Sequence, residues 1–169
     1  MTWHTYKLDE IAQRLVLQAH QQSKDPLNQS YKMRTTVAFG LERFWGEHIR
    51  LLSKAEEKTK KIKKTEERNA KKAKTEEFNQ GLYWYNTWEA FADLMGEAHI
   101  FLPRGFNPTP KSREIESIAQ QFWGGMPIKH GKSETKLTLE DRRIAQAVLT
   151  QLCDSLVWWT QRYKDLDSK

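Results

Sequence analysis

Apolar residues recur at helical spacing through most of the chain. The first such series is Leu8, Ile11, Ala12, Leu15 and Ala19. Intervals of three and four residues place these side chains on one side of a helix, and polar residues take the other side. The spacing predicts a helix from Tyr6 to about Gln22. It ends before Pro26, because proline has no backbone donor and disfavours a helical residue in front of it.

A second apolar series starts near Asn28 or Ser30, both of which are suitable N-cap residues. Its members are Met33, Val37, Leu41, Phe44, His48 and Leu52, followed more sparsely by Ala55, Thr59, Ile62 and Ala73. The second half of this helix can bury little surface. We therefore expect it to project beyond the core or to pair loosely with a partner chain, and we expect Asn79–Gln80–Gly81 to end or kink it.

Three further helices are predicted after Gly81. The buried stripe of the third helix comprises Tyr85, Trp88, Phe91, Ala92, Met95 and Ala98. Three prolines make Leu102–Pro110 a loop. A short fourth helix, with Thr109 as its cap, buries Ile115, Ile118, Ala119 and Phe122 and ends at Gly124–Gly125.

Residues Gly124–Lys136 have the composition of a mobile loop. Thr138–Asp141 resembles a capping box at the start of the last helix, which runs to about Leu166. One broad face of that helix carries Ile144, Val148, Leu149, Leu152, Leu156, Trp159 and Tyr163. No segment has a strand pattern. The fold class is therefore all-α, a bundle of about five helices with one long charged helix projecting from it.

The positive charge is concentrated in one part of the chain. A length of 169 residues suits a single helical domain over 1–169, in which residues 53–80 form a charged helical arm. Ser53–Glu77 contains ten Lys or Arg and six Glu, so it carries +4 of the formal net charge of +6. The remainder of the chain is nearly neutral, and its seven Trp and seven Phe can fill the core of a bundle.

The sequence also indicates in which cellular compartment the protein is expected. Cys153 is the single cysteine, which excludes an internal disulfide and suits a reducing environment. The first residues lack the apolar core of a signal peptide, and no stretch approaches the roughly 20 apolar residues of a membrane span. We expect a cytoplasmic protein without a membrane partner.

Eight cations between Lys32 and Lys72 align if this segment is one straight helix. They are Lys32, Arg43, Arg50, Lys54, Lys61, Lys64, Arg68 and Lys72, and at about 100° per residue they fall within about 40° of one line. Spacings of eleven residues keep them aligned because eleven residues make almost three turns. Glu57 is the only acid on that line.

A basic ridge about 60 Å long would follow the phosphate backbone of RNA or single-stranded DNA. Such contacts are independent of sequence and sensitive to salt. The alternative interpretation is a charged helix that is simply solvated.

No catalytic or metal-binding pattern emerges. Gly125–Ser133 differs from a phosphate-binding loop because five residues separate its glycines instead of four, and no strand precedes it. The histidines lack metal-binding spacings; His48 is expected in the core, and Cys153 is expected to be a small buried residue. We therefore expect a protein that is not an enzyme and has no metal or cofactor.

The tryptophans allow several interpretations. Trp158 and Trp159 are adjacent and diverge by about 100°, so one of them should be partly exposed. Trp84 and Trp88 lie in a similarly crowded stretch. These four residues form either a wide buried stripe, an interface with another protein, or a platform for base stacking.

The closing sequence RRIAQAVLTQLCDSLVWWTQRYK resembles the final helix of the small subunits of CRISPR effector complexes, especially the type III kind. Those subunits are basic all-α bundles that stack along the guide–target filament and contact its backbone without catalysis. The likeness covers Leu139–Lys164 and the overall character of the chain. It implies phosphate contacts from Arg and Lys, self-association in a row and a role in antiviral defence. The long charged helix up to Glu77 departs from that family.

The last helix is also similar to that of the basic accessory protein of diversity-generating retroelements, which binds a reverse transcriptase and its RNA. Our leading hypothesis is a non-catalytic subunit of a ribonucleoprotein complex that contacts RNA or single-stranded DNA through the basic face. Its partners would be other protein subunits or copies of itself. The alternative is a structural adaptor whose charged helix pairs with another protein.

Overall fold

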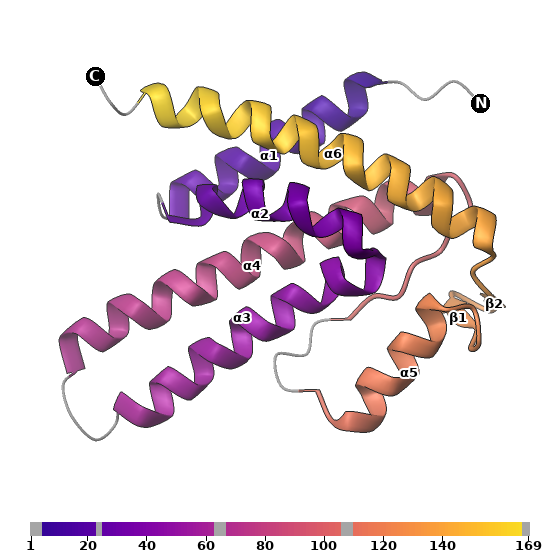
Figure 1. The fold of residues 1–169 in the computed structure, drawn as a ribbon, viewed down its shortest axis with the longest axis horizontal. Helices are drawn as coiled ribbons and strands as arrows, with labels where there is room; N and C mark the ends of the chain where they lie inside the picture. The colour runs from indigo at the N-terminus through magenta and orange to yellow at the C-terminus, as the bar shows by residue number, and fades with distance from the viewer. Residues whose placement is uncertain (1–4, 23–24, 63–66, 106–109, 167–169) are drawn as a thin grey trace.

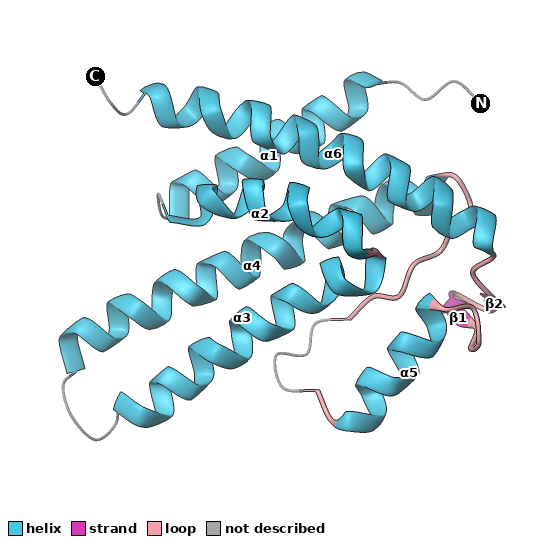
Figure 2. Ribbon diagram, in the orientation of Figure 1, coloured by secondary structure: helices cyan, strands magenta, loops and turns pink. Residues whose placement is uncertain are grey.

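The computed structural model describes residues 5–22, 25–62, 67–105 and 110–166. Its helices are α1 (Thr5–Gln22), α2 (Gln29–Thr36), α3 (Leu41–Ile62), α4 (Glu67–Glu97), α5 (Ser112–Phe122) and α6 (Leu139–Leu166), joined by the 3-10 turns η1 (Asp25–Asn28) and η2 (Val37–Phe39). Figure 1 shows their arrangement. The chain also forms β1 (Ile128–His130) and β2 (Ser133–Thr135), a small antiparallel hairpin that is visible in Figure 2. The all-α class is confirmed.

The predicted single helix from Ser30 to Glu77 is wrong, because the chain bends at Gly40. Gly40 has φ +114°, a conformation that favours glycine, and it separates α2 and η2 from α3. Its carbonyl oxygen accepts a hydrogen bond from Phe44 N at 3.2 Å, which begins α3. The basic line therefore changes direction after its first member, Lys32.

The same prediction is wrong at a second place, because the chain reverses direction after α3. Helix α4 runs back along α3, so the charged arm is a helical hairpin whose two helices pair within one chain (Figure 1). Helix α4 also continues through Asn79–Gly81, where the sequence predicted a stop or kink. At Gly81 an added Cβ would lie only 2.8 Å from Leu52 Cγ, so this glycine allows α3 and α4 to approach closely.

Aromatic residues from α3, α4 and α5 meet in the core. Phe44 lies 4.8 Å from Trp84, and Trp88 lies 5.5 Å from Phe91, measured between ring centroids. Phe122, the one buried residue of α5, packs against Trp88 at 5.6 Å. This cluster fixes the base of the hairpin and the end of α5.

Buried hydrogen bonds connect helices that are distant in the sequence. Ser30 Oγ lies 2.6 Å from both Tyr83 Oη and Thr160 Oγ1, which joins α2, α4 and α6. Trp84 Nε1 donates to Gln29 Oε1, and Trp88 Nε1 donates to the carbonyl oxygen of Pro103. Polar groups buried with partners of this kind favour one packing arrangement over others.

Two expectations for the C-terminal half have opposite outcomes. The capping box is confirmed, because Asp141 N donates to Thr138 Oγ1 and Thr138 N donates to Asp141 Oδ2. The segment Gly124–Lys136, expected to be a mobile loop, instead contains the β-hairpin. A Cβ at Gly124 would lie 2.4 Å from the carbonyl oxygen of Leu137, so glycine is needed where the hairpin meets α6.

Candidate nucleic-acid interface

Exposed cations lie on α2, before the bend, and along one side of α3 after it. Those from the predicted line are Lys32 on α2 and Arg43, Arg50, Lys54 and Lys61 on α3, all of them exposed. We call these five residues the α2–α3 basic face. The opposite side of α3 is buried through Phe44, Leu51 and Ala55, so the sequence of α3 itself decides which side faces outward.

Ion pairing divides the basic face into two groups. Arg50 Nη2 lies 2.7 Å from Glu47 Oε2, and Arg50 Nε lies 2.9 Å from the same oxygen. The hydrogen bonds that Arg50 donates to Glu47 raise the pKa of Arg50, so this guanidinium stays charged and is partly neutralised by its neighbour. Helical spacing alone places Glu47 outside the basic line, but its side chain reaches into it.

Lys54 is paired across the hairpin. Its Nζ lies 3.2 Å from Glu77 Oε1, and Lys58 Nζ lies 2.7 Å from the same oxygen. Burial acts to raise the pKa of Glu77, but the hydrogen bonds and charges of Lys58 and Lys54 outweigh it and leave that pKa lowered. One carboxylate on α4 thus forms ion pairs with two ammonium groups on α3.

The other three cations of the basic face make no ion pair with a described residue. Lys32 and Lys61 extend into solvent, and Arg43 places its guanidinium 5.8 Å from the centre of the Phe39 ring. These three residues are therefore the ones best placed to meet a phosphate.

Two exposed aromatic rings on α2 and η2 each have a cation within about 6 Å. Phe39 in η2 is 65% exposed, the most of any large apolar side chain in the described part of the chain. Tyr31 is 39% exposed, with Lys164 Nζ 5.2 Å from its ring centre. Sequence reasoning missed both rings. A large apolar residue directly before a glycine, at a possible bend, was the only available signal for Phe39.

The remaining three predicted cations do not belong to the described part of α2 or α3. Lys64 lies outside the described residues, and Arg68 and Lys72 belong to α4, which runs antiparallel to α3. The prediction that all eight cations form one ridge is therefore wrong. The described part of the basic face is short and bent, with Phe39 and Arg43 at its corner.

The four predicted interface tryptophans occupy different environments. Trp84 and Trp88 are 1% and 0% exposed, so both belong to the core and neither can present a surface. On α6, Trp158 is 47% exposed with the Arg162 guanidinium 4.1 Å from its ring centre, while Trp159 is half-buried. The expectation that adjacent tryptophans diverge is confirmed.

Other chemical features of the described residues are limited. They contain no group of three His, Cys, Asp or Glu side chains arranged to hold a metal ion. His48 and Cys153 are buried, as expected, and burial raises the pKa of the Cys153 thiol. None of the helices in the described ranges combines the length and the apolar character that a bilayer span needs.

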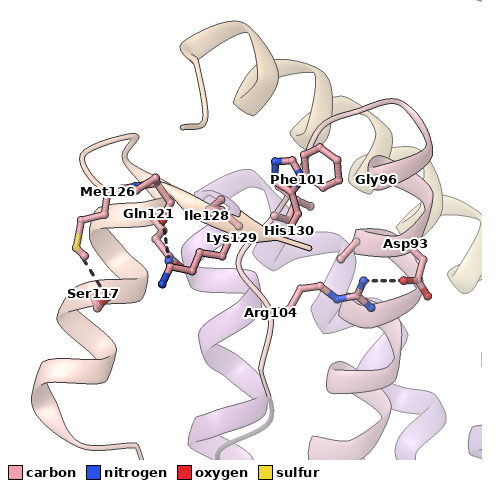
Figure 3. A pocket seen from close by; sticks show the side chains of 13 residues that line it. Asp93, Gly96, Phe101, Arg104, Ser117, Gln121, Met126, Ile128, Lys129 and His130 are labelled. Carbon is pink, nitrogen blue, oxygen red and sulfur yellow. Dashed lines mark hydrogen bonds and ion pairs between the residues drawn. The ribbon is translucent and has the colours of Figure 1, made fainter. Parts of the chain in front are cut away.

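A cavity whose lining shares no residue with the basic face lies elsewhere on the molecule. It is bounded by the end of α4, by α5 and by the β-hairpin, and has a volume of about 730 Å³ (Figure 3).

In comparisons with protein families, curated proteins and solved structures, no family model and no protein matches this chain.

Proposed function

We propose that this protein binds single-stranded nucleic acid through the α2–α3 basic face and performs no catalysis itself. The single observation that carries the proposal is the juxtaposition at the bend. There, the Phe39 ring in η2 is exposed directly before the bend, and the Arg43 guanidinium lies 5.8 Å from the centre of that ring. Cations beside exposed rings suit a strand whose phosphates and unpaired bases are both accessible.

The geometry favours an unpaired strand over a duplex. Base pairing hides the faces of bases inside a stack, whereas an unpaired base can lie against an exposed aromatic ring. Each such stacking contact contributes about 1–3 kcal/mol and tolerates any base. The basic face has the corresponding mixture of rings and charges, with Tyr31 and Phe39 on α2 and η2.

The resemblance of α6 to CRISPR small subunits supports a place for the protein within a ribonucleoprotein complex. In such a complex the basic face would contact the strand, and other surfaces would contact neighbouring subunits. The alternative, an adaptor whose charged helix pairs with a partner protein, receives less support. Leu52 and Ala55, two members of the apolar series that it would use, are buried within the chain's own fold.

The proposal is tested by charge reversal with a matched control. The face variant changes Lys32, Arg43 and Lys61 to Glu, and the control variant changes Arg14, Lys132 and Lys136, three exposed cations elsewhere, to Glu. Each variant exchanges three positive charges for three negative ones, so the formal net charge of +6 falls to zero in both. Affinity for an unstructured RNA is then measured against salt concentration by fluorescence anisotropy.

The face variant is expected to lose affinity and to show a shallower salt dependence. For single strands the logarithmic slope changes by about 0.7 for each phosphate contact, so loss of three contacts lowers it by about 2. The control variant should retain the wild-type slope. Equal affinities and slopes in the two variants would contradict the proposal, because net charge alone would then explain the binding.

A further inference from the structure

The cavity at the end of α4 has three walls of different character. Asp93 and Gly96 come from the last turns of α4, and Ser117 and Gln121 come from α5 on the opposite side (Figure 3). Residues 126–130, which include β1, form the third wall. The volume of about 730 Å³ is within the range of small-molecule sites in proteins, about 300–1,000 Å³.

One wall contains a pair of parallel rings. The imidazole of His130 lies on the ring of Phe101 with a centroid separation of 3.6 Å and an angle of 5° between the planes. His130 Nε2 is also 3.3 Å from Thr135 Oγ1, so the imidazole on β1 contacts a side chain of β2. A flat, aromatic ligand can extend such a stack.

The charged groups at the cavity leave one cation available. The Arg104 guanidinium pairs with Asp93 Oδ1 at 2.7 Å and with Glu89 Oε2 at 2.6 Å. Burial alone would lower the pKa of Arg104, but these carboxylates raise it, so the group stays charged and engaged. Lys129, in contrast, lines the cavity and makes no ion pair with any described residue.

Polar groups complete the lining between the rings and the cation. Gln121 donates from Nε2 to the carbonyl oxygen of Pro127 at 3.1 Å, which holds its side chain at the cavity wall. The carboxylate of Asp93 retains capacity to accept further hydrogen bonds. Ala92, Leu102 and Ile128 supply the apolar part of the lining.

We propose that this cavity binds a nucleotide unit, with the base against the Phe101–His130 pair and the phosphate at Lys129. A flat ring joined to an anionic group matches the ring pair and Lys129 of the lining, and Asp93 and Gln121 lie in the same lining to meet the edge of the base. The ligand is either a free nucleotide or one nucleotide of a strand. The site does not depend on the α2–α3 basic face, because the two sets of residues do not overlap.

The test measures binding of adenosine 5′-monophosphate and of a single-stranded oligoadenylate to the full chain by calorimetry. Gly96→Leu fills the cavity, since no atom lies within 4 Å of a Cβ added at this lining residue. Its control is Gly46→Leu, at a second helical glycine with open space, away from the cavity. Lys129→Ala removes the proposed phosphate contact, and Lys132→Ala, in the turn of the hairpin, is its control.

Both cavity variants are expected to bind the monophosphate about tenfold or more weakly than the wild type does, whereas both controls should bind it with the wild-type affinity. If the oligoadenylate loses affinity in parallel, the site takes a nucleotide of a strand; if only the monophosphate does, the ligand is free nucleotide. The face variant of Lys32, Arg43 and Lys61 should bind the monophosphate normally, which separates this site from the proposed function. Absence of monophosphate binding by the wild type, or equal binding by Gly96→Leu and Gly46→Leu, would overturn the inference. Should Gly96→Leu fail to fold, Lys129→Ala against Lys132→Ala decides the matter alone.

Discussion

Ion pairing determines how much each cation of the basic face can contribute to binding a phosphate. Arg50 and Lys54 already interact with Glu47 and Glu77, and a phosphate must compete with these carboxylates. An exposed ion pair such as Arg50–Glu47 is worth only about 0–1 kcal/mol, so competition there is feasible but reduces the gain. Lys32, Arg43 and Lys61 have no such competitor among the described residues, and their charges act on the strand directly.

His48 introduces a pH dependence into the stability of the fold. Its imidazole is buried on α3; Nδ1 contacts the carbonyl oxygen of Trp45, and Nε2 has no hydrogen-bond partner in the described structure. Burial lowers the pKa of His48 below its ordinary value of 6.5, although the backbone hydrogen bond acts in the opposite direction. The folded state therefore disfavours the protonated ring.

Stability is accordingly expected to decrease as the pH falls below 6.5. There the unfolded chain binds a proton at His48 that the folded chain resists, and the cost is at most about 1.4 kcal/mol per pH unit. Urea unfolding between pH 7 and about pH 5 measures this pH dependence of the free energy of unfolding. His48→Leu should flatten this dependence. His99→Asn, an exposed site with φ +60° that asparagine tolerates, should preserve it. An unchanged slope in His48→Leu would refute the assignment.

At the scale of elements, the sequence predicts which segments are helical better than it predicts where they turn. The apolar series Met33, Val37, Leu41 and Phe44 continues at helical spacing across Gly40, so periodicity gave no sign of the bend. An isolated glycine within a helical pattern is only a weak break signal. The capping residues Thr138 and Asp141, by contrast, act locally, and α6 could be placed from them.

Gly81 illustrates why tertiary contacts escape sequence reasoning. Its flexibility suggested a kink, yet α4 continues through it, and the role of the glycine is to admit the side chains of Leu51 and Leu52 from α3. That role exists only because α3 and α4 are antiparallel neighbours. Ser53–Glu77 contains neither glycine nor proline, so nothing in the sequence indicated the reversal.

The two helical glycines Gly81 and Gly46 are expected to respond oppositely to alanine. In Gly81→Ala, overpacking against Leu52 costs about 1–3 kcal/mol, and the gain in helix propensity of about 1 kcal/mol offsets only part of it. We expect a net loss of about 1 kcal/mol in the free energy of unfolding. Gly46→Ala has open space and should gain up to about 1 kcal/mol. Urea denaturation measures both, and stabilisation by Gly81→Ala would show that α3 and α4 are not in close contact there.

At the scale of the whole molecule, the outer parts of α3 and α4 project from the rest of the bundle. In Figure 1 the ends of α3 and α4 at the lower left extend past the other helices. The core aromatic residues hold only the base of this hairpin, and Glu77 joins its two helices further out through Lys54 and Lys58. A strand lying on the outer part of α3 would thus meet a projecting helix, and the lining of the cavity beside α5 shares no residue with the basic face.

Lysine footprinting tests the central claim most directly, because it locates the contact surface within the intact protein. The chain is acetylated with and without saturating unstructured RNA, and the modification of each lysine is measured by mass spectrometry. Lys32 and Lys61 are expected to be protected by RNA, whereas Lys132 and Lys136, which are equally exposed on and beside the β-hairpin, should react as they do without it. Unchanged reactivity at Lys32 and Lys61, or equal protection at all four lysines, would contradict binding through the α2–α3 basic face.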